Sequence, residues 1–570
     1  MNLIRITLED GTCRKCRPHT PAGTLLKKPH DARGLPFIGA RVNNDIVSLT
    51  YPLEINAELR FLTMTDPQGM RIYRDSLSFL LAKTAAALFP DGRFSVEHSL
   101  GAGLFCRFEA MAGGRASPAV ARLQRGGQGG ALSARQVAAL EAAMRRIIAR
   151  NLPIRRRKLS FADALERFQK AGMQDKVNLL RFRNPPKIVV YECDRFVDLA
   201  HGPLAPATGA LGYFKLIHYP PGLVLQLPSG EAPRRVTPFR DQPQLFQIFH
   251  EHKTWGRILG VTNVGRLNEL IMNGDVREFM RIEEAFHEKK IVRIADRIGA
   301  LRRQVRLILA AGPSSAGKTT FAKRLAVQLE VNGLRPVMIS LDNYYVDDAE
   351  TPRDAAGRPD YEHIEAVDVE LFNQHLLKLF AGKIVELPRF NFERKRRESG
   401  GARLRLAPGQ VVIVEGIHGL NPRFTHRIPE RQKFTIYISA LTQLAIDAGN
   451  RISTTDNRLM RRLVRDHAYR GNSALATLRM WPSVRRGEKT WIFPYQAKAD
   501  ATFNSALDYE LAVLKPLVEP LLMDIKPADP EYAEARRLQE FLLNFLAIPK
   551  YDVPPTSILR EFIGASSFKY

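Results

Sequence analysis

The stretch Gly312-Pro-Ser-Ser-Ala-Gly-Lys-Thr319 decides the fold of the second half of this chain. It follows the apolar run Val305–Ala311 and precedes the helical pattern Phe321–Leu329. A glycine loop of the form G-x-x-x-x-G-K-[ST] between a strand and a helix binds nucleotide phosphates, because its backbone N–H groups and the positive end of the helix dipole face the anion. The loop therefore predicts a nucleotide-binding α/β domain.

The side chains of this loop have distinct expected roles in holding ATP and Mg²⁺. We expect Lys318 to bridge the β- and γ-phosphates and the Thr319 hydroxyl to ligate Mg²⁺. The predicted ATP-binding residues are Gly312, Pro313, Ser314, Ser315, Ala316, Gly317, Lys318, Thr319 and Thr320. The loop alone indicates nucleotide binding, so the chemistry has to be argued from other residues.

Apolar runs typical of buried parallel strands recur on both sides of the loop. They are Val305–Ala311, Pro336–Leu341, Val411–Val414 and Phe434–Ile438, separated by helical patterns such as Phe321–Leu329 and Val369–Leu379. Strands that are apolar along their whole length are typical of a sheet covered on both faces. The pattern predicts a doubly wound parallel-sheet domain.

Two carboxylates follow strands of this predicted sheet. Asp342 comes directly after Pro336–Leu341, and Glu415 ends the run Val411–Val414. Ligands of open α/β sheets gather at the carboxyl ends of the strands. We expect Asp342 to take the proton from an attacking hydroxyl and to lie, with Glu415, near Mg²⁺. The alternative for either acid is a solvated residue at a strand end.

A run of arginines follows further along, at Arg458, Arg461, Arg462, Arg465 and Arg470. Arginines spaced three to five residues apart share one face of a helix and can balance the charge on a phosphoryl group in transfer. We therefore predict that Arg465 and Arg470 act with Lys318 in catalysis. The alternative is a basic amphipathic helix without a catalytic role.

Length, charge and cysteine content bound the rest of the chain. With 570 residues it is too long for one hydrophobic core, and its formal charge of +26 would attract polyanions such as RNA. A solvated basic surface explains the charge equally well. The four cysteines fit a reducing compartment, and no apolar stretch is long enough to span a bilayer. We expect a multidomain cytoplasmic protein without membrane contact, which could form homo-oligomers.

The hydrophobic pattern changes several times along the chain, from short alternating runs to helical spacing near Met70 and then to mixed α/β. The predicted segments are a β-rich module at 1–66, an α+β domain at 67–245, a helical connector at 246–303, the P-loop domain at 304–506 and a helical tail at 507–570. Within the tail, Ser557–Phe562 is expected to be a helix that packs back on the body.

The motifs of the second half resemble the uridine kinase and phosphoribulokinase family of P-loop kinases over roughly 305–500. The matching stretches are Ser340-Leu-Asp-Asn-Tyr-Tyr345, Glu415-Gly-Ile417 and Arg461–Gly471. The resemblance implies that Asp342 is the catalytic aspartate, that Glu415 is associated with Mg²⁺, and that Arg461–Gly471 forms a lid.

The same resemblance points to acceptor-binding positions. Glu362 stands where uridine kinases have a sugar-binding aspartate, and Arg462 matches a lid arginine. The base-reading positions differ, because this chain has Phe390-Asn-Phe392 followed by Lys395 where those kinases show Tyr-Asp-Phe and a histidine. Asn472 likewise replaces a lid arginine. Recognition of uracil or cytosine is therefore in question.

The first 245 residues resemble the two amino-terminal domains of threonyl-tRNA synthetase. Residues 1–65 resemble its β-grasp-like TGS module and residues 67–245 its editing-type domain. The matching stretches are Arg74–Ala82, Gly103–Phe108 and Phe196–Leu204. The four positions that carry the synthetase's His, His, Cys and His hold Asp75, Phe79, Ala200 and Leu204 here. Because Phe, Ala and Leu neither bind metal nor move protons, we expect a scaffold without hydrolytic editing. This scaffold could still bind RNA, a nucleotide or the kinase domain itself.

Three functions are compatible with these features. The first is Mg·ATP-dependent phosphorylation of a hydroxyl, with a nucleoside 5′-hydroxyl as the expected acceptor. The second keeps the chemistry and changes the acceptor to another small alcohol or a sugar phosphate. The third is a regulator that responds to RNA or nucleotide and uses ATP to drive a switch.

Overall fold

The computed structural model describes residues 3–110, 131–183, 185, 187–391, 394–398 and 400–569. The chain forms two compact units. The first contains Met1–Glu269, Gln443–Ile452 and Ile525–Leu546, and the second contains Leu270–Thr442, Ser453–Asp524 and Ala547–Tyr570. None of the described helices combines the length and apolar character needed to cross a bilayer.

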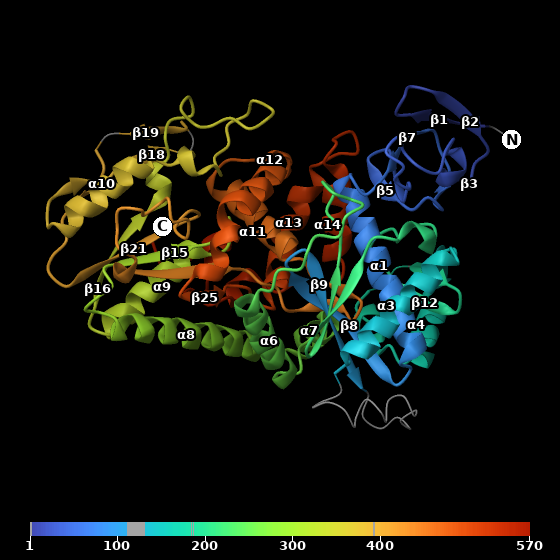
Figure 1. Ribbon diagram of the computed structural model, residues 1–570, viewed down its shortest axis with the longest axis horizontal. Coiled ribbons are helices and arrows are strands. Elements are labelled where there is room, and N and C mark those ends of the chain that lie inside the picture. Colours follow the sequence, from blue (N-terminus) through green and yellow to red (C-terminus); the bar gives the residue numbers. More distant parts are fainter. Residues whose placement is uncertain are drawn as a thin grey trace. The chain divides into compact units, whose positions relative to one another are not determined.

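The second unit is built on a five-stranded parallel sheet, of which β16, β21, β15 and β25 are labelled in Figure 1. Its strands, in spatial order, are β16 (Arg335–Ser340), β21 (Gln410–Gly416), β15 (Leu307–Ala311), β22 (Lys433–Ser439) and β25 (Ala501–Asn504). The doubly wound fold and its first four strands are as predicted. The edge strand β25 was not predicted, because four residues of mixed polarity carry no periodic signal.

Both faces of this sheet are covered, which explains the unbroken apolar runs. On one face Ile308, Ile413 and Ile436 pack with helices α8 (Val276–Ala300) and α9 (Lys318–Val331). On the other face Leu309 and Val414 pack with α10 (Val369–Phe380). Neighbouring residues of a strand therefore enter opposite cores, and each strand has to be apolar throughout.

Helix α8 lies in the stretch predicted as a connector. That stretch is helical, with α6 (Pro243–Ile258) and α7 (Val264–Asn273) before it. Figure 1 shows α8 running alongside α9, and Ile291, Ile294 and Ile298 are buried in the core of the sheet. Charged residues alternate with these apolar ones along the helix, so the apolar stripe is hard to recognise in the sequence.

Further helices complete the second unit around the phosphate-binding loop. They are α11 (Thr454–Tyr469), α12 (Ala474–Gly487), α13 (Glu510–Met523) and the short α15 (Arg560–Ile563) near the carboxyl end. A small hairpin of β18 (Arg389–Asn391) and β19 (Arg396–Glu398) follows α10.

The first unit begins with a five-stranded sheet of mixed direction. Its order is β2 (Cys13–Cys16), β1 (Ile4–Leu8), β7 (Ala57–Leu62), β4 (Gly39–Val42) and β5 (Asp45–Val47). Strands β1 and β7 are parallel and the other pairs are antiparallel. The β-rich character predicted for this part of the chain agrees with this arrangement.

Two more sheets follow within the first unit. The larger, in the order β13 (Lys215–Tyr219), β14 (Gly222–Gln226), β9 (Gly103–Ala110) and β8 (Gly92–Leu100), shares a core with α1 (Pro67–Leu88) and α3 (Ala134–Ala149). The smaller contains β10 (Arg155–Ser160), β11 (Lys187–Cys193) and β12 (Phe196–Leu199), with α4 (Phe161–Lys170) and α5 (Gln174–Leu180) beside it. The α+β character expected here is confirmed.

Two segments from much later in the sequence complete the first unit. The hairpin of β23 (Ala445–Asp447) and β24 (Asn450–Arg451) supplies Asp447, whose carboxylate lies 3.0 Å from Lys176 Nζ and 3.1 Å from His201 Nε2. Helix α14 (Tyr532–Leu542) supplies Glu534, which lies 3.0 Å from Arg71. The predicted segments are continuous in sequence, so their boundaries do not include these two later segments in the first unit.

Candidate active site

The phosphate-binding loop connects β15 to α9, and two of its glycines are required by their surroundings. A Cβ on Gly312 would lie 1.9 Å from the carbonyl oxygen of Ile438. Gly317 has φ +80°, and a Cβ there would lie 2.4 Å from Ile558 Cγ2. Lys318 Nζ donates to the carbonyl oxygen of Pro313 at 3.1 Å. The loop is therefore closely packed from behind, with its lysine folded along it.

Helix α11 holds the loop through three arginines. Arg458 Nε donates to the Ser314 carbonyl at 2.9 Å, and Arg462 Nη1 donates to the Ser314 hydroxyl at 2.8 Å. Arg461 lies 3.5 Å from the Ser315 carbonyl. These contacts come from one helical face, as the spacing of the arginines predicts.

Two of these arginines are fixed by buried acids. Arg458 is paired with Glu488, and Arg461 Nε donates to Glu510 at 2.7 Å. All four side chains are almost completely buried. Each guanidinium and carboxylate therefore compensates the other for lost hydration, and Arg458 and Arg461 form part of the wall behind the loop.

Asp466 gathers the remaining arginines of the helix. Its carboxylate lies 3.1 Å from Arg462, 2.7 Å from Arg465 and 3.9 Å from Arg470. Burial acts to raise the pKa of Asp466, but these arginines outweigh it and hold that pKa below its usual value. The neighbouring Arg465, together with burial, lowers the pKa of Arg470 to about 10. Three positive charges are thus concentrated around one acid.

The two predicted carboxylates and Lys318 influence one another electrostatically. Burial and the nearby Asp342 raise the pKa of Glu415 to about 7. Burial lowers the pKa of Lys318, and the attraction of Glu415 and Asp342 opposes that shift. Ser340 Oγ donates to Glu415 at 2.5 Å and accepts from the Asp342 N–H at 3.4 Å. The structure therefore brings all three groups to one edge of the sheet.

These residues fit a divalent cation. Burial, and after it the repulsion of the neighbouring Asp342 carboxylate, raises the pKa of Glu415, so a cation between the two acids would be favourable. Hard oxygen ligands are the kind that Mg²⁺ prefers. Thr319 is the second residue of α9, directly after Lys318, and carries a hydroxyl oxygen. Thr319, Asp342 and Glu415 are thus a suitable ligand set.

Glu362 belongs to the same electrostatic group. Burial raises its pKa, while Arg462 and Lys318 act in the opposite direction. Its Oε2 atom is buried and makes no hydrogen bond to any described residue. Such an atom is costly unless a ligand or water satisfies it, which makes Glu362 a candidate acceptor contact.

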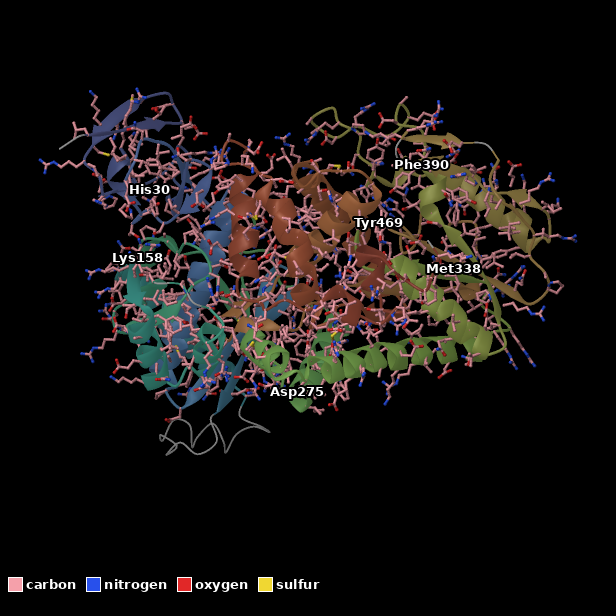
Figure 2. All side chains as sticks on the ribbon, turned by 180° about the vertical axis from the view of Figure 1, so that it is seen from behind. His30, Lys158, Asp275, Met338, Phe390 and Tyr469 are labelled. Atoms are coloured by element: carbon pink, nitrogen blue, oxygen red, sulfur yellow. The ribbon has the colours of Figure 1, made fainter. Side chains whose placement is uncertain are left out.

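The other predicted acceptor positions lie in different settings. Phe390, labelled in Figure 2, is 7% exposed and packs on Tyr345 with ring centroids 5.6 Å apart. Lys395 is exposed, with Nζ 5.9 Å from the centre of the Tyr361 ring. Asn472 donates its backbone N–H to the Asp466 carbonyl at 3.1 Å. Phe390 is part of the core beside the site, whereas Lys395 and Asn472 keep partly free side-chain surfaces.

Several residues that organise the site were not singled out from the sequence. They are Ser340, Asp466, Glu488, Glu510 and Glu561. Asp466 could have been found as the lone acid within an arginine run. Glu488 and Glu510 pair with Arg458 and Arg461 of α11, and Glu561 accepts from Thr320 of α9. These acids come from segments distant in the sequence, and no local pattern identifies such contacts.

The positions equivalent to the synthetase site lie in the first unit and are mostly core. Phe79 and Leu204 are buried, and Phe79 meets Phe196 edge-on at 5.2 Å. Ala200 packs against the same cluster, and Asp75 pairs with Arg74 at 3.2 Å. The side chains at these positions therefore serve packing and a surface ion pair.

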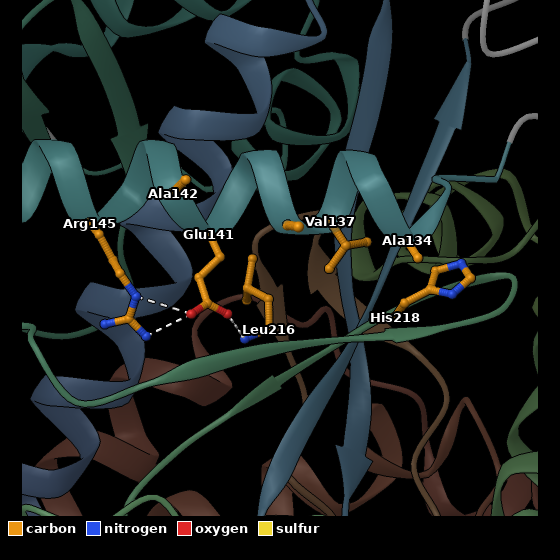
Figure 3. Close-up of a pocket in the computed structure, with 8 residues that line it drawn as sticks. Ala134, Val137, Glu141, Ala142, Arg145, Leu216 and His218 are labelled. Carbon is orange, nitrogen blue, oxygen red and sulfur yellow. Dashed lines mark hydrogen bonds and ion pairs between the residues drawn. The ribbon is translucent and has the colours of Figure 1, made fainter.

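A pocket of about 350 Å³ lies on α3 and β13 in the first unit (Figure 3). Glu141 at its centre accepts from Arg145 at 2.7 Å and from the Leu216 N–H at 2.8 Å. His218 Nε2 lies 2.9 Å from the Leu132 carbonyl. Since these polar groups already satisfy one another, the pocket offers no converging set for a ligand.

Comparison with known proteins finds a similarity for each part of the chain. Residues 307–512 match the Phosphoribulokinase / Uridine kinase family. Threonine–tRNA ligase of Desulforamulus reducens is 30% identical over 218 residues, which cover 38% of this chain and 31% of the relative. Threonine–tRNA ligase of Thermotoga maritima is 29% identical over 184 residues, which cover 32% of this chain and 26% of the relative. This similarity covers the amino-terminal half. The chain spans about a third of the length of these relatives.

Two solved structures are also similar to the chain. One is described as a possible uridine kinase from Bacillus stearothermophilus, with 19% identity, a TM-score of 0.27, and coverage of 38% of this chain and 98% of that one. The other is D-glycerate 3-kinase from Cryptococcus neoformans, with 13% identity, a TM-score of 0.20, and coverage of 44% and 88%.

Proposed function

We propose that this protein is an ATP-dependent kinase. The premise is that its carboxy-terminal part is a domain of the phosphoribulokinase and uridine kinase family, joined to a front part that is similar to threonine–tRNA ligase. It transfers a phosphoryl group to a hydroxyl, and the favoured acceptor is the 5′-hydroxyl of a nucleoside. The observation that carries the proposal is the meeting of Lys318, Asp342 and Glu415 with the arginines around Asp466.

The donor side follows from the loop. Backbone N–H groups at the start of α9 receive the phosphates, and Lys318 turns from the Pro313 carbonyl toward the β- and γ-phosphates. Mg²⁺ held by Thr319, Asp342 and Glu415 would neutralise phosphate charge. Arg465 and Arg470 stabilise the negative charge on the phosphoryl group during transfer, because Asp466 fixes them near the loop.

The acceptor side rests on two carboxylates. Asp342 takes the proton of the attacking hydroxyl, which leaves the oxygen free to bond to phosphorus. Glu362, with its unpartnered oxygen, accepts from a second hydroxyl of the acceptor and so orients it. Arg462 lies between Ser314 of the loop and Asp466, within the electrostatic reach of Glu362.

The test is an acceptor panel. The full-length protein is incubated with Mg·ATP and nucleosides, and product is measured beside Asp342→Asn and the control Glu430→Gln, an exposed acid paired with Lys433. We expect Asp342→Asn to lower turnover by about 10²- to 10⁴-fold and the control to have little effect. Absence of product from every acceptor, or equal turnover in Asp342→Asn, would contradict the proposal.

A second candidate changes only the acceptor. Phe390 is packed into the core, and Lys395 places a positive charge next to Tyr361, which differs from the base-reading pattern of uridine kinases. A lysine suits an anionic acceptor such as a sugar phosphate. Adding sugars, small alcohols and sugar phosphates to the same panel distinguishes the two.

A third candidate is a regulator that binds RNA. Strand β10 presents Arg155, Arg157 and Lys158 at its exposed positions, and Figure 2 labels Lys158. The relatives of this front part are ligases of tRNA. RNA binding that weakens steeply with salt, without phosphorylation of any acceptor, would favour this candidate.

A further inference from the structure

The carboxyl-terminal segment of the second unit packs directly on the phosphate-binding loop. Ile558 fills the space beside Gly317, and the ring of Phe562 lies 5.1 Å from the guanidinium carbon of Arg461. Lys323 of α9 donates to the backbone carbonyl of Lys569, so the last described residues also lie against the helix that follows the loop. The helical tail predicted from Ser557–Phe562 is thus a short helix at the active site.

One side chain of this segment contacts the loop's own phosphate donors. Glu561 Oε2 accepts from the Thr320 backbone N–H at 2.9 Å and from the Thr320 hydroxyl at 2.9 Å. Thr320 is fully buried and lies in the first turn of α9. The N–H groups of a first turn have no partner within the helix and are the groups that anions bind.

The carboxylate of Glu561 therefore resembles a bound phosphate in position and charge. It also lies close enough to act on Lys318, whose pKa is affected by Glu561 as well as by Glu415 and Asp342. A nucleotide phosphate brought to the same donors would compete for both hydrogen bonds. It would also meet the negative charge of the carboxylate.

We propose that Glu561 is an autoinhibitory residue that occupies a nucleotide-phosphate position on α9 and has to leave Thr320 before ATP binds fully. This inference concerns regulation and rests on the donor site of the proposed kinase. ATP binding and tail position are consequently linked, so any factor that draws Glu561 away tightens ATP binding.

The surrounding contacts indicate which part moves. Ile558 and Phe562 are fully buried and anchor the segment, whereas Glu561 is only partly buried. Arg560 holds the turn through the carbonyl of Gly564 at 3.2 Å. A change in the Glu561 side chain alone releases Thr320 without unpacking the segment.

The test measures ATP binding to the full-length protein by calorimetry. Glu561→Gln keeps the shape of the side chain and removes its charge, and Glu561→Ala removes the contact. The control is Glu519→Gln on α13, where the acid pairs with Lys515 at 3.7 Å. We expect both Glu561 variants to bind ATP about tenfold more tightly than the wild type, since one charge-assisted hydrogen bond is worth about that factor.

A second experiment measures the binding of adenosine to the same proteins. Because it lacks phosphates, its affinity should be the same in the wild type and Glu561→Gln, whereas a general loosening of the site would change both ligands. Thermal unfolding establishes that each variant is folded. If Glu561→Ala does not fold, the ATP affinity of Glu561→Gln alone tests the inference. Equal or weaker ATP binding by Glu561→Gln overturns the inference.

Binding and phosphorylation are read separately, so the two proposals fail in different ways. ATP binding that tightens in Glu561→Gln without any phosphorylated acceptor supports the inference and contradicts the kinase proposal. Phosphorylation of an acceptor, with the same ATP affinity in the wild type and Glu561→Gln, supports the kinase proposal and contradicts the inference. If neither the wild type nor the variant binds ATP, both are wrong.

Discussion

Asp466 shows how one residue can organise several charges. It is a fully buried carboxylate within hydrogen-bond distance of Arg462 and Arg465, and Arg470 lies 3.9 Å away. Without it, three guanidinium groups would repel one another beside the loop. The acid is therefore a positioning residue, which acts on phosphate through the arginines that it orients.

Replacing Asp466 with Asn tests this role. Removing one member of a buried ion network leaves uncompensated charge, so we expect a loss of about 3–5 kcal/mol in the free energy of unfolding. Urea denaturation measures this loss, and ATP affinity should fall with it. Glu519→Gln is the control, and unchanged ATP affinity in a folded Asp466→Asn would contradict the assignment.

A buried histidine predicts an acid-sensitive stability. His98, 5% exposed, stacks on Phe249 with ring centroids 3.7 Å apart, and burial lowers its pKa to about 3. Since the unfolded histidine has a pKa of 6.5, the unfolded state binds more protons between the two values. The contribution of the buried neutral His98 to the free energy of unfolding is fully present above pH 6.5 and is lost as the pH falls toward 3.

We expect the free energy of unfolding to fall below pH 6.5 by about 1.4 kcal/mol for each pH unit from this group alone. His98→Phe should reduce the slope. Urea titrations of both proteins at pH 7 and pH 5 measure it, and parallel losses in the two would show that other groups are responsible.

At the scale of elements, the strands and loop of the second unit could be predicted because their signals are local. The runs at Val305–Ala311 and Val411–Val414 became β15 and β21, and the glycine loop lies between β15 and α9. Strand β25 could not be predicted, because its four residues are held by pairing with β22 rather than by their own pattern.

The candidate site was predictable in part for the same reason. Asp342 lies just after β16, Glu415 lies near the end of β21, and Lys318 follows the glycine loop after β15. Their position at one sheet edge is a consequence of the fold. The acids Glu488 and Glu510 come from other helices and pair with Arg458 and Arg461. Such long-range pairing depends on packing that no sequence spacing records.

The loop supplies a prediction of its own. Gly312→Ala would place a methyl group 1.9 Å from the Ile438 carbonyl oxygen, which is backbone and cannot rotate away. We expect a loss of stability of about 1–3 kcal/mol and of ATP binding. Gly299→Ala on α8 is the matched control, since its nearest contact would be 3.5 Å. Thermal unfolding and calorimetry with ATP measure both, and equal behaviour of the two variants would argue against this steric account.

At the scale of the whole molecule, the first unit depends on residues from far along the chain. Lys176 is almost completely buried between Asp198 at 2.9 Å and Asp447 at 3.0 Å. Asp447 belongs to the hairpin of β23 and β24, which the sequence order places between β22 and α11. The interior of this unit is therefore incomplete in any fragment that ends before residue 443.

A fragment of residues 1–269 tests this dependence. It keeps Lys176 and Asp198 but loses Asp447, and we expect it to unfold at lower urea concentration than the same unit in the full-length protein, because an ion pair has been broken in the interior. Lys176→Met in the fragment should recover part of the loss. Circular dichroism follows both, and a fragment as stable as the parent would contradict the expectation.

The division of the chain between its units has a consequence for how the two could ever be separated. The polypeptide passes from one unit to the other after residues 269, 442, 452, 524 and 546. A protease that cuts at one of these points leaves the halves tethered by the others. A recombination event with a single breakpoint likewise cannot transfer either unit whole, so neither the P-loop unit nor the ligase-like unit can be exchanged alone by such an event.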